Sequence, residues 1–305
     1  MASRFRISRR SLLAAAAALV LAVNGLAQPA ASDLTFLAVG DWGAVTGAQR
    51  KVAAQMAKSA ESISARFVIS TGDNFYPDGV KSVEDPQWKT TFEDAFAAPS
   101  LMIPWHVVLG NHDHRSNFNA EVEYTEHSAR WRMPATYYKH SETLADGSLA
   151  DFFFTDSDAI RDFFNRPMGR SAGGPQMIWL RHELAASTAR WKIVVGHHPV
   201  FSGGLHGNTV ALVALLKPLL EQYGVQVYLN GHDHDLQHVV VGKVHYLTSG
   251  AGSKPHPSKP VAGTRFVMGN RPGFMTARLA PHAMDIEFID GEGTSLYRAS
   301  IPVAP

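Results

Sequence analysis

The chain has 305 residues, of which 45% are hydrophobic and 18% charged; this is globular composition and excludes a disordered, collagen-like or coiled-coil protein. Cysteine is absent, which excludes disulfides, thiolate metal sites and cysteine nucleophiles, so any metal must be bound by His, Asp, Glu, Asn or Tyr. The formal charge is +1, but residues 1–27 hold four arginines and no acid. The rest has 24 basic and 27 acidic residues, a net charge of −3, which argues against nucleic-acid or polybasic membrane binding.

The first 27 residues have the order of a secretory signal. Residues 1–10 are basic, an apolar run of 12 residues extends from Leu12 to Val23, and Gly25-Leu26-Ala27 offers a small-residue cleavage site. The run is too short to cross a bilayer, which takes about 20 residues. Because Arg9 and Arg10 directly precede it, the segment resembles a twin-arginine signal, with an ordinary secretory signal as the alternative. We expect export by the twin-arginine machinery, cleavage, and a periplasmic or secreted protein without a stable membrane anchor.

Beyond the signal, short apolar runs alternate with helical patterns. Helices are predicted near Gln49–Ile63 and Thr209–Tyr223, and Pro218 interrupts the second pattern. Strands that each end at a polar loop are predicted at Leu34–Val39, Arg66–Thr71, His106–Leu109, Lys192–Val195 and Val225–Leu229. This alternation predicts α/β layers with several parallel strands.

The chain turns β-rich after Leu236. Further strands are predicted at Val239–Val241, Tyr246–Ser249, Phe274–Leu279, Met284–Ile289 and Leu296–Ile301. Residues 140–150 are predicted to be a loop. Since no repeat and no long linker interrupts the pattern, we expect a single domain over residues 33–305.

The loops after the five polar-ended strands share one feature: a glycine is followed by a residue that can bind a metal. These pairs are Gly40-Asp41, Gly72-Asp73, Gly110-Asn111, Gly196-His197 and Gly231-His232, with His234 two residues further on. The carboxyl ends of strands are where open α/β sheets bind ligands. One such pair alone is more typical of turn chemistry, but five in order indicate a common site.

Five sequence blocks carry a resemblance to a known family. They are Gly40-Asp41-Trp42-Gly43, Gly72-Asp73-Asn74-Phe75-Tyr76, Gly110-Asn111-His112-Asp113, Val194-Val195-Gly196-His197 and Gly231-His232-Asp233-His234. They look like the purple acid phosphatases, in particular the small tartrate-resistant type, within the calcineurin-like metallophosphoesterases. The resemblance covers most of residues 34–252. It implies a layered β-sandwich flanked by helices (α/β/β/α), with the metal site at the carboxyl ends of strands.

The resemblance also implies two sets of metal ligands. They are Asp41, Asp73, Tyr76 and His234 for the first metal, and Asp73, Asn111, His197 and His232 for the second. Two neighbouring cations can stabilise both the attacking and the leaving oxygen of a phosphoryl transfer. Asp73 lies in the middle of the set and is the natural bridge. His232 and His234 would face the same way in an extended segment, whereas a tight loop could direct them at different metals; the sequence leaves both arrangements open.

Residue 43 distinguishes this chain from most calcineurin-like enzymes, which have Asp-x-His in the first block. Here the third position is Gly43, and Tyr76, three residues after Asp73, takes the place of the missing histidine. A phenolate is a hard anionic donor that favours a trivalent ion. We therefore expect Fe(III) in the first site and a divalent metal, Zn, Fe or Mn, in the second. Because Fe(III) acidifies bound water strongly, a metal-bound hydroxide nucleophile at acid pH follows.

His112 and His206 are the candidate catalytic residues. The family places histidines at both positions, for phosphate contact and for protonation of the leaving group. This sequence departs from the mammalian-type pattern at Leu205, where those proteins carry an acid. Any acidic partner of His206 must therefore come from elsewhere in the chain.

These expectations describe an exported acid phosphatase that hydrolyses phosphate monoesters, either small molecules or phosphoproteins, and has no nucleic-acid partner. A phosphodiesterase acting on nucleotides is the alternative, and the missing first-block histidine counts against it. An inactive metal-binding recognition module is another, disfavoured by the complete ligand set. Redox chemistry at an iron pair is a fourth.

Overall fold

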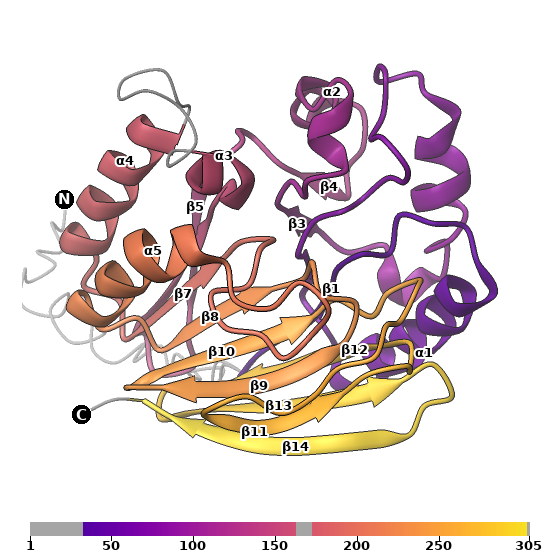
Figure 1. The fold of residues 1–305 in the computed structure, drawn as a ribbon. Helices are drawn as coiled ribbons and strands as arrows, with labels where there is room; N and C mark the ends of the chain where they lie inside the picture. Colours follow the sequence, from indigo (N-terminus) through magenta and orange to yellow (C-terminus); the bar gives the residue numbers. More distant parts are fainter. Residues whose placement is uncertain (1–32, 163–172, 304–305) are drawn as a thin grey trace, which may run out of the picture. The chain divides into compact units, whose positions relative to one another are not determined.

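The computed structural model describes residues 33–162 and 173–303. The predicted export signal, residues 1–27, lies outside these residues. Within the described part, two seven-stranded mixed sheets lie against each other, and helices cover their outer faces (Figure 1). None of the helices in this part combines the length and the apolar character that a membrane crossing needs.

The first sheet has the strand order β14-β13-β12-β1-β2-β3-β4. In that order the strands are Ser295–Pro302, Ala283–Asp290, Gly273–Leu279, Leu34–Val39, Phe67–Ser70, Trp105–Val107 and Trp131–Arg132. Strands β1, β2, β3 and β4 run parallel to one another, while β12, β13 and β14 form an antiparallel extension on the other side of β1. The central β1 is a nearly continuous apolar run because both of its faces are covered.

The second sheet has the order β11-β9-β10-β8-β7-β6-β5. In that order the strands are Thr264–Met268, Leu236–Val241, Val244–Ser249, Val227–Asn230, Trp191–Val195, Leu149–Phe154 and Tyr138–Thr143. Strands β10, β8, β7 and β6 are parallel, and antiparallel strands flank them on both sides. The carboxyl ends of the parallel strands of both sheets carry the five predicted loops.

Five α-helices lie in the described residues: α1 Gly47–Ile63, α2 Asn119–Glu123, α3 Ser157–Asp162, α4 Gly173–Ala186 and α5 Val210–Gln222. Four short turns of other helix types complete them: η1 Trp88–Glu93, η2 Pro99–Leu101, η3 Asp113–Arg115 and η4 Tyr124–Glu126.

Helix α1 begins where the Thr46 hydroxyl accepts a hydrogen bond from the Gln49 N–H, at 3.1 Å, and ends at Ser64 in the left-handed conformation (φ 51°). Its apolar residues Val52, Met56 and Ala60 recur at helical spacing and are buried.

The hydrophobic core has two parts. One lies between the sheets and joins Phe36 and Ile69 of the first sheet to Phe152 and Ile193 of the second. The other packs Leu180 of α4 and leucines of α5 against the outer face of the second sheet, on the side where Figure 1 draws these helices. The fold is thus the layered α/β architecture that the resemblance implied.

The predicted loop at residues 140–150 is wrong. The structure has a hairpin there, in which β5 and β6 pair and only residues 144–148 form the turn, with Gly147 at φ 83°. Strand β5 alternates between inward and outward residues, but its inward face carries His140 and Glu142, which bind each other at 2.9 Å. An edge strand without apolar alternation gives no period-2 hydrophobic signal.

Candidate metal centre

The five predicted loops meet at one edge of the two sheets. The Asp41 N–H donates to Gly72 O at 2.9 Å, the Gly231 N–H to His197 O at 3.0 Å, and the His232 N–H to Asp41 Oδ2 at 2.9 Å. Asp41, Asp73 and His232 have φ values of 58°, 53° and 69°, in the left-handed region that non-glycine residues rarely adopt. Such strain concentrates at functional sites, and here all three residues belong to the predicted ligand set.

Tyr76 lies at the centre of the first group of side chains. Its Oη is 2.9 Å from Asp73 Oδ2, 3.2 Å from Asp41 Oδ1 and 3.1 Å from His234 Nε2. His234 Nε2 is also 3.4 Å from Asp41 Oδ1. Even without Tyr76, the ligand atoms of Asp41, Asp73 and His234 all lie within 4.8 Å of one another. We call these four residues the first cluster.

His197 lies at the centre of the second group. Its Nε2 is 3.2 Å from Asn111 Oδ1, 3.2 Å from His232 Nδ1 and 3.5 Å from Asp73 Oδ1. We call these four residues the second cluster. Asp73 belongs to both clusters, with Oδ2 directed at the first and Oδ1 at the second.

The donor atoms fit two cations. Ligand atoms that surround one ion at bond lengths of about 2.1 Å lie about 3.0 to 3.4 Å apart, and the distances within each cluster are 2.9 to 3.5 Å. The histidine rings are also oriented for binding. Nδ1 of His197 donates to Thr71 O at 2.8 Å and Nδ1 of His234 to Lys254 O at 2.7 Å, which leaves each Nε2 with its lone pair directed into a cluster.

Without a cation, burial disfavours the charged forms of the side chains in both clusters. Burial raises the pKa of Asp41, and burial together with the charges of Asp41 and Asp73 raises the pKa of the Tyr76 phenol well above its usual value. Burial lowers the pKa of His234, but the hydrogen bond and charge of Asp41 outweigh it and raise that pKa to about 9. Burial and the neighbouring His197 lower the pKa of His232 far below its usual range. An oxygen-rich cluster beside a cluster with two imidazoles suits a hard cation next to a borderline one.

Close packing of the backbone explains why residue 43 is a glycine. A Cβ at this position would lie 2.5 Å from Phe75 N and 2.6 Å from Asn74 C. The loop that carries Asp73 and Tyr76 therefore occupies the space in which a residue-43 side chain would start. Gly110 is similar, since its Cβ would lie 2.2 Å from Asp73 Oδ1.

His232 and His234 enter different clusters. His232 approaches His197, whereas His234 approaches Tyr76, and the backbone between residues 231 and 235 turns rather than extends. Of the two arrangements that the sequence left open, the structure has the tight loop.

His112 and His206 lie next to the clusters. The His112 ring is 4.5 Å from the Tyr76 ring, its Nδ1 donates to Pro77 O, and its backbone N–H donates to Asp73 Oδ1 at 2.9 Å. The His206 ring is 4.3 Å from that of His232, and its side chain is 45% exposed.

Asp233 is the acidic partner of His206. Its Oδ1 is 2.9 Å from His206 Nδ1 and also accepts the His206 backbone N–H at 2.8 Å, while Oδ2 accepts the Ser202 hydroxyl. Nothing in the sequence marks this pair, because Asp233 is 27 residues from His206 and lies between two candidate ligands.

A second missed feature is a pair of fully buried acids behind the clusters. Asp113 accepts the backbone N–H groups of Asn74, Phe75 and Gly110 at 2.8 to 3.1 Å, so it joins the loop of Asp73 to the loop of Asn111. The Asn74 side chain donates to both Asp113 and Glu121. Burial raises the pKa of Asp113 to about 7. The third sequence block held Asp113, but nothing in its spacing marked it as a connection between loops.

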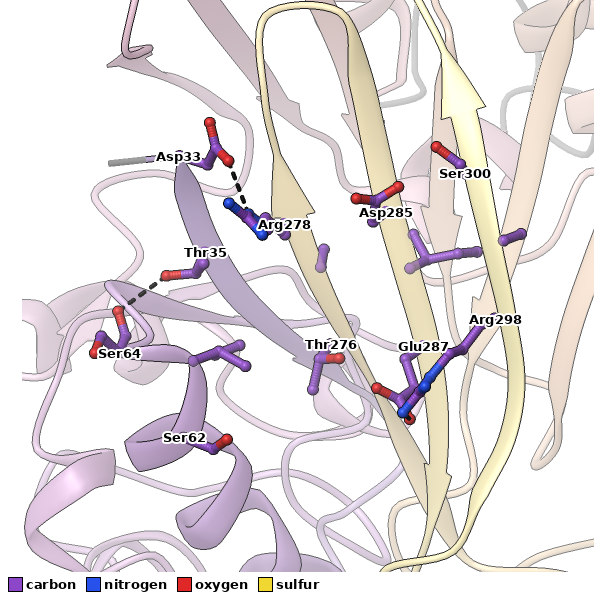
Figure 2. A pocket seen from close by; sticks show the side chains of 14 residues that line it. Asp33, Thr35, Ser62, Ser64, Thr276, Arg278, Asp285, Glu287, Arg298 and Ser300 are labelled. Atoms are coloured by element: carbon purple, nitrogen blue, oxygen red, sulfur yellow. Dashed lines mark hydrogen bonds and ion pairs between the residues drawn. The ribbon is translucent and has the colours of Figure 1, made fainter. Parts of the chain in front are cut away.

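A separate groove of about 940 Å³ lies on the outer face of the first sheet, beside the end of α1 (Figure 2). Its charged side chains are largely paired: Arg278 binds Asp33 at 2.7 Å, and Arg298 binds Glu287 at 2.8 Å. It contains none of the cluster residues, and we use it below as a source of control substitutions.

Comparison with known proteins agrees with this fold and site. The profile of the calcineurin-like phosphoesterase family matches residues 34–236. The anchor GAP50 of the Plasmodium inner membrane complex superposes with a TM-score of 0.82 at 25% identity, over 90% of each chain. The purple acid phosphatase PPD1 of yellow lupin superposes with a TM-score of 0.66 at 13% identity, over 89% of this chain and 54% of the lupin chain, which supports the fold alone. The fold and site define a metal-dependent phosphoester hydrolase.

Relatives in sequence identify the group within this family. Tartrate-resistant acid phosphatase type 5 of Homo sapiens is 36% identical over 308 residues, which cover 92% of this chain and 95% of the human protein. Purple acid phosphatase 4 of Arabidopsis thaliana is 36% identical over 288 residues, covering 87% of this chain and 83% of the plant protein. The chain belongs to the tartrate-resistant and purple acid phosphatases within the calcineurin-like phosphoesterase family.

Proposed function

We propose that this protein is an acid phosphatase that hydrolyses phosphate monoesters, small molecules or phosphoproteins, at a dinuclear centre of Fe(III) and a divalent metal (Zn, Fe or Mn). The observation that carries the proposal is the Tyr76 hydroxyl, which lies within 3.2 Å of two carboxylates and an imidazole. A phenol in that position is a ligand for a hard trivalent ion. Burial and the charges of Asp41 and Asp73 raise the pKa of the phenol, so the phenolate form that binds iron requires a cation beside it.

Asp41, Asp73, Tyr76 and His234 would hold the Fe(III), and Asp73, Asn111, His197 and His232 would hold the divalent metal. Once bound, the two cations would neutralise the charge of the phosphate ester and supply a nucleophile by lowering the pKa of water.

Protonation of the leaving group and contact with the phosphate are assigned to His206 and His112. Asp233 holds the His206 ring through Nδ1, so the other nitrogen is the one that presents a proton to the leaving oxygen. His112, fixed through Pro77 O and packed edge-on against Tyr76, is placed to contact the phosphate from the first-cluster side.

A recognition module is the second candidate, because GAP50, a protein of the same fold, is an anchor in a membrane complex. Fold alone does not decide between the two. The complete, closely spaced ligand set and the His206–Asp233 pair favour the enzyme. Turnover of a chromogenic phosphate monoester supports the phosphatase, and turnover of its bis-ester analogue supports a phosphodiesterase. A recognition module would hydrolyse neither.

Replacement of Tyr76 by phenylalanine tests the iron assignment. A phenolate bound to Fe(III) gives a charge-transfer band in the visible, so the metal-loaded protein should be coloured and Tyr76→Phe colourless. We expect weaker iron binding and a smaller loss of turnover than for a variant of Asp73, because Tyr76 belongs to one cluster only. The measurements are visible spectrum, iron content and turnover.

Tyr137→Phe is the matched control, since the Tyr137 ring packs against Trp179 of α4, and it should keep its colour. An active, iron-containing wild type without a visible band, or a coloured Tyr76→Phe, contradicts the phenolate assignment.

We further propose that residues 33–305 are one phosphatase domain exported by way of the signal in residues 1–27. Arg9→Lys with Arg10→Lys should block export, because a twin-arginine receptor recognises the guanidinium pair while the general secretory route accepts any positive charge. Fractionation of periplasmic and cytoplasmic activity measures this. Arg4→Lys with Arg6→Lys is the control. Normal periplasmic activity of the Arg9/Arg10 variant would indicate an ordinary secretory signal.

A further inference from the structure

A pocket of about 490 Å³ opens from the second cluster on the side of His206. Its lining includes Asn111 and His232 of the cluster and His206 itself. Further from the cluster, it is lined by His114, Arg115, Asp158 and Arg161. The pocket is therefore continuous with the proposed reaction centre, but its far wall has no assigned role.

The leaving group of the substrate must occupy this pocket. A group that protonates the leaving oxygen has to lie within hydrogen-bond reach of that oxygen. His206 has this role in the proposed function and lines the pocket, so the organic part of the ester extends from the His206 side toward the far wall.

Two guanidinium groups belong to that wall. The Arg115 side chain is 49% exposed, and its contacts within the described residues are long: 3.4 Å to Pro77 O and 3.6 Å to Asp78 Oδ1. A guanidinium has five N–H donors, so contacts of this length leave most of its capacity for a ligand.

Arg161, at the end of α3, is held more firmly. It binds Asp158 at 2.8 Å and His198 at 3.1 Å. Among the described residues of the lining, Asp158 is the one carboxylate beside two arginines. His114 is bound to Asp156 at 3.0 Å, outside the lining.

We infer that Arg115 and Arg161 form an anion-binding subsite for the leaving group, so that the enzyme prefers phosphate monoesters whose leaving group carries a second anionic substituent. The inference rests on the proposed function. The reaction remains simple hydrolysis: water adds to phosphorus and releases a proton to solvent, the ester P–O bond breaks, and the departing oxygen takes a proton from His206, which solvent then reprotonates. The arginines bind the substituent, a carboxylate or a second phosphate, and take no part in bond breaking.

The test compares phenyl phosphate with 4-carboxyphenyl phosphate, which differ by one carboxylate. For the wild type we expect a higher kcat/KM for the carboxylated ester, and the ratio should fall as NaCl is added, because the contact is partly exposed. Arg115→Gln should lower kcat/KM for the carboxylated ester by about 3- to 10-fold, as expected for one partly exposed charged hydrogen bond. It should leave phenyl phosphate within about twofold. Arg161→Gln should act in the same direction.

Arg298→Gln is the matched control, since Arg298 lies in the groove of Figure 2 with a 73% exposed side chain. A bisphosphate ester with a matched monophosphate, assayed in parallel, shows whether the subsite also takes phosphate. Calorimetric binding of phenylphosphonate and 4-carboxyphenylphosphonate gives a second readout that does not need turnover.

Equal losses on both esters, or a ratio unchanged by Arg115→Gln and Arg161→Gln, would overturn the inference while leaving the phosphatase intact. If the metal-loaded wild type hydrolyses neither ester, the proposed function fails. The phosphonate titrations then still decide the subsite, since a preference for the carboxylated ligand that Arg115→Gln removes supports it and no preference refutes it.

Discussion

Asp73→Ala should have no measurable phosphatase activity and a reduced content of both metals. The carboxylate is directed at both clusters, with Oδ2 2.9 Å from Tyr76 Oη and Oδ1 3.5 Å from His197 Nε2. Without it each cation loses a ligand, and the two ions lose the shared anion that offsets their mutual repulsion. Loss at one site should therefore accompany loss at the other, which metal analysis can measure directly.

The fold should survive this substitution. The Asp73 side chain accepts the His112 N–H, but the surrounding loops are also held by backbone hydrogen bonds and by Asp113. A thermal unfolding transition close to that of the metal-free wild type would separate loss of metal from loss of structure. Asp285→Ala, an exposed acid in the groove of Figure 2, should keep metals and activity. An Asp73→Ala protein with two metals and near-normal turnover would refute the ligand assignment.

The parallel strands and their loops could be predicted from the sequence because their physical signals are local. Strand β1 is apolar throughout and ends at Gly40-Asp41, so its pattern and its boundary coincide. Helix α5 was predicted within one residue at each end, and Pro218 does not end it. The hairpin of β5 and β6 was missed because His140 and Glu142 replace the apolar residues that would mark an inward face.

In the candidate site, too, some residues could be predicted from local sequence signals, whereas contacts between separate loops could not. Six of the seven cluster residues could be selected because a glycine followed by a polar residue recurs at strand ends, with His234 close behind His232. Tyr76 was indicated only by the family resemblance and by Gly43, and the structure brings all seven together. The bond between His206 and Asp233 and the connection made by Asp113 depend on how separate loops approach each other in space. No spacing along one chain encodes that approach.

His206→Ala should slow turnover by about 10²- to 10⁴-fold for alkyl phosphates and by much less for nitrophenyl phosphate. A departing alkoxide is strongly basic and needs a proton as the P–O bond breaks, whereas a nitrophenolate leaves without one. Metal content should not change, because His206 is in neither cluster. His182→Ala, on the exposed surface of α4 with a 76% exposed side chain, is the control and should behave as the wild type. Equal losses on both kinds of ester would indicate a binding or structural role for His206.

Asp233→Asn tests whether Asp233, the hydrogen-bond partner of His206, supports protonation of the leaving group. The change keeps the size of the side chain but replaces the charged acceptor of the His206 ring, which is 2.9 Å away. We expect a smaller loss than for His206→Ala, with the same dependence on the leaving group. The double variant should lose no more than His206→Ala alone, because Asp233 acts through the ring that the first change removes, and residues that form one unit are not additive. Additive losses, or a loss of metal from Asp233→Asn, would mean that Asp233 acts on the neighbouring ligands His232 and His234 instead of on His206.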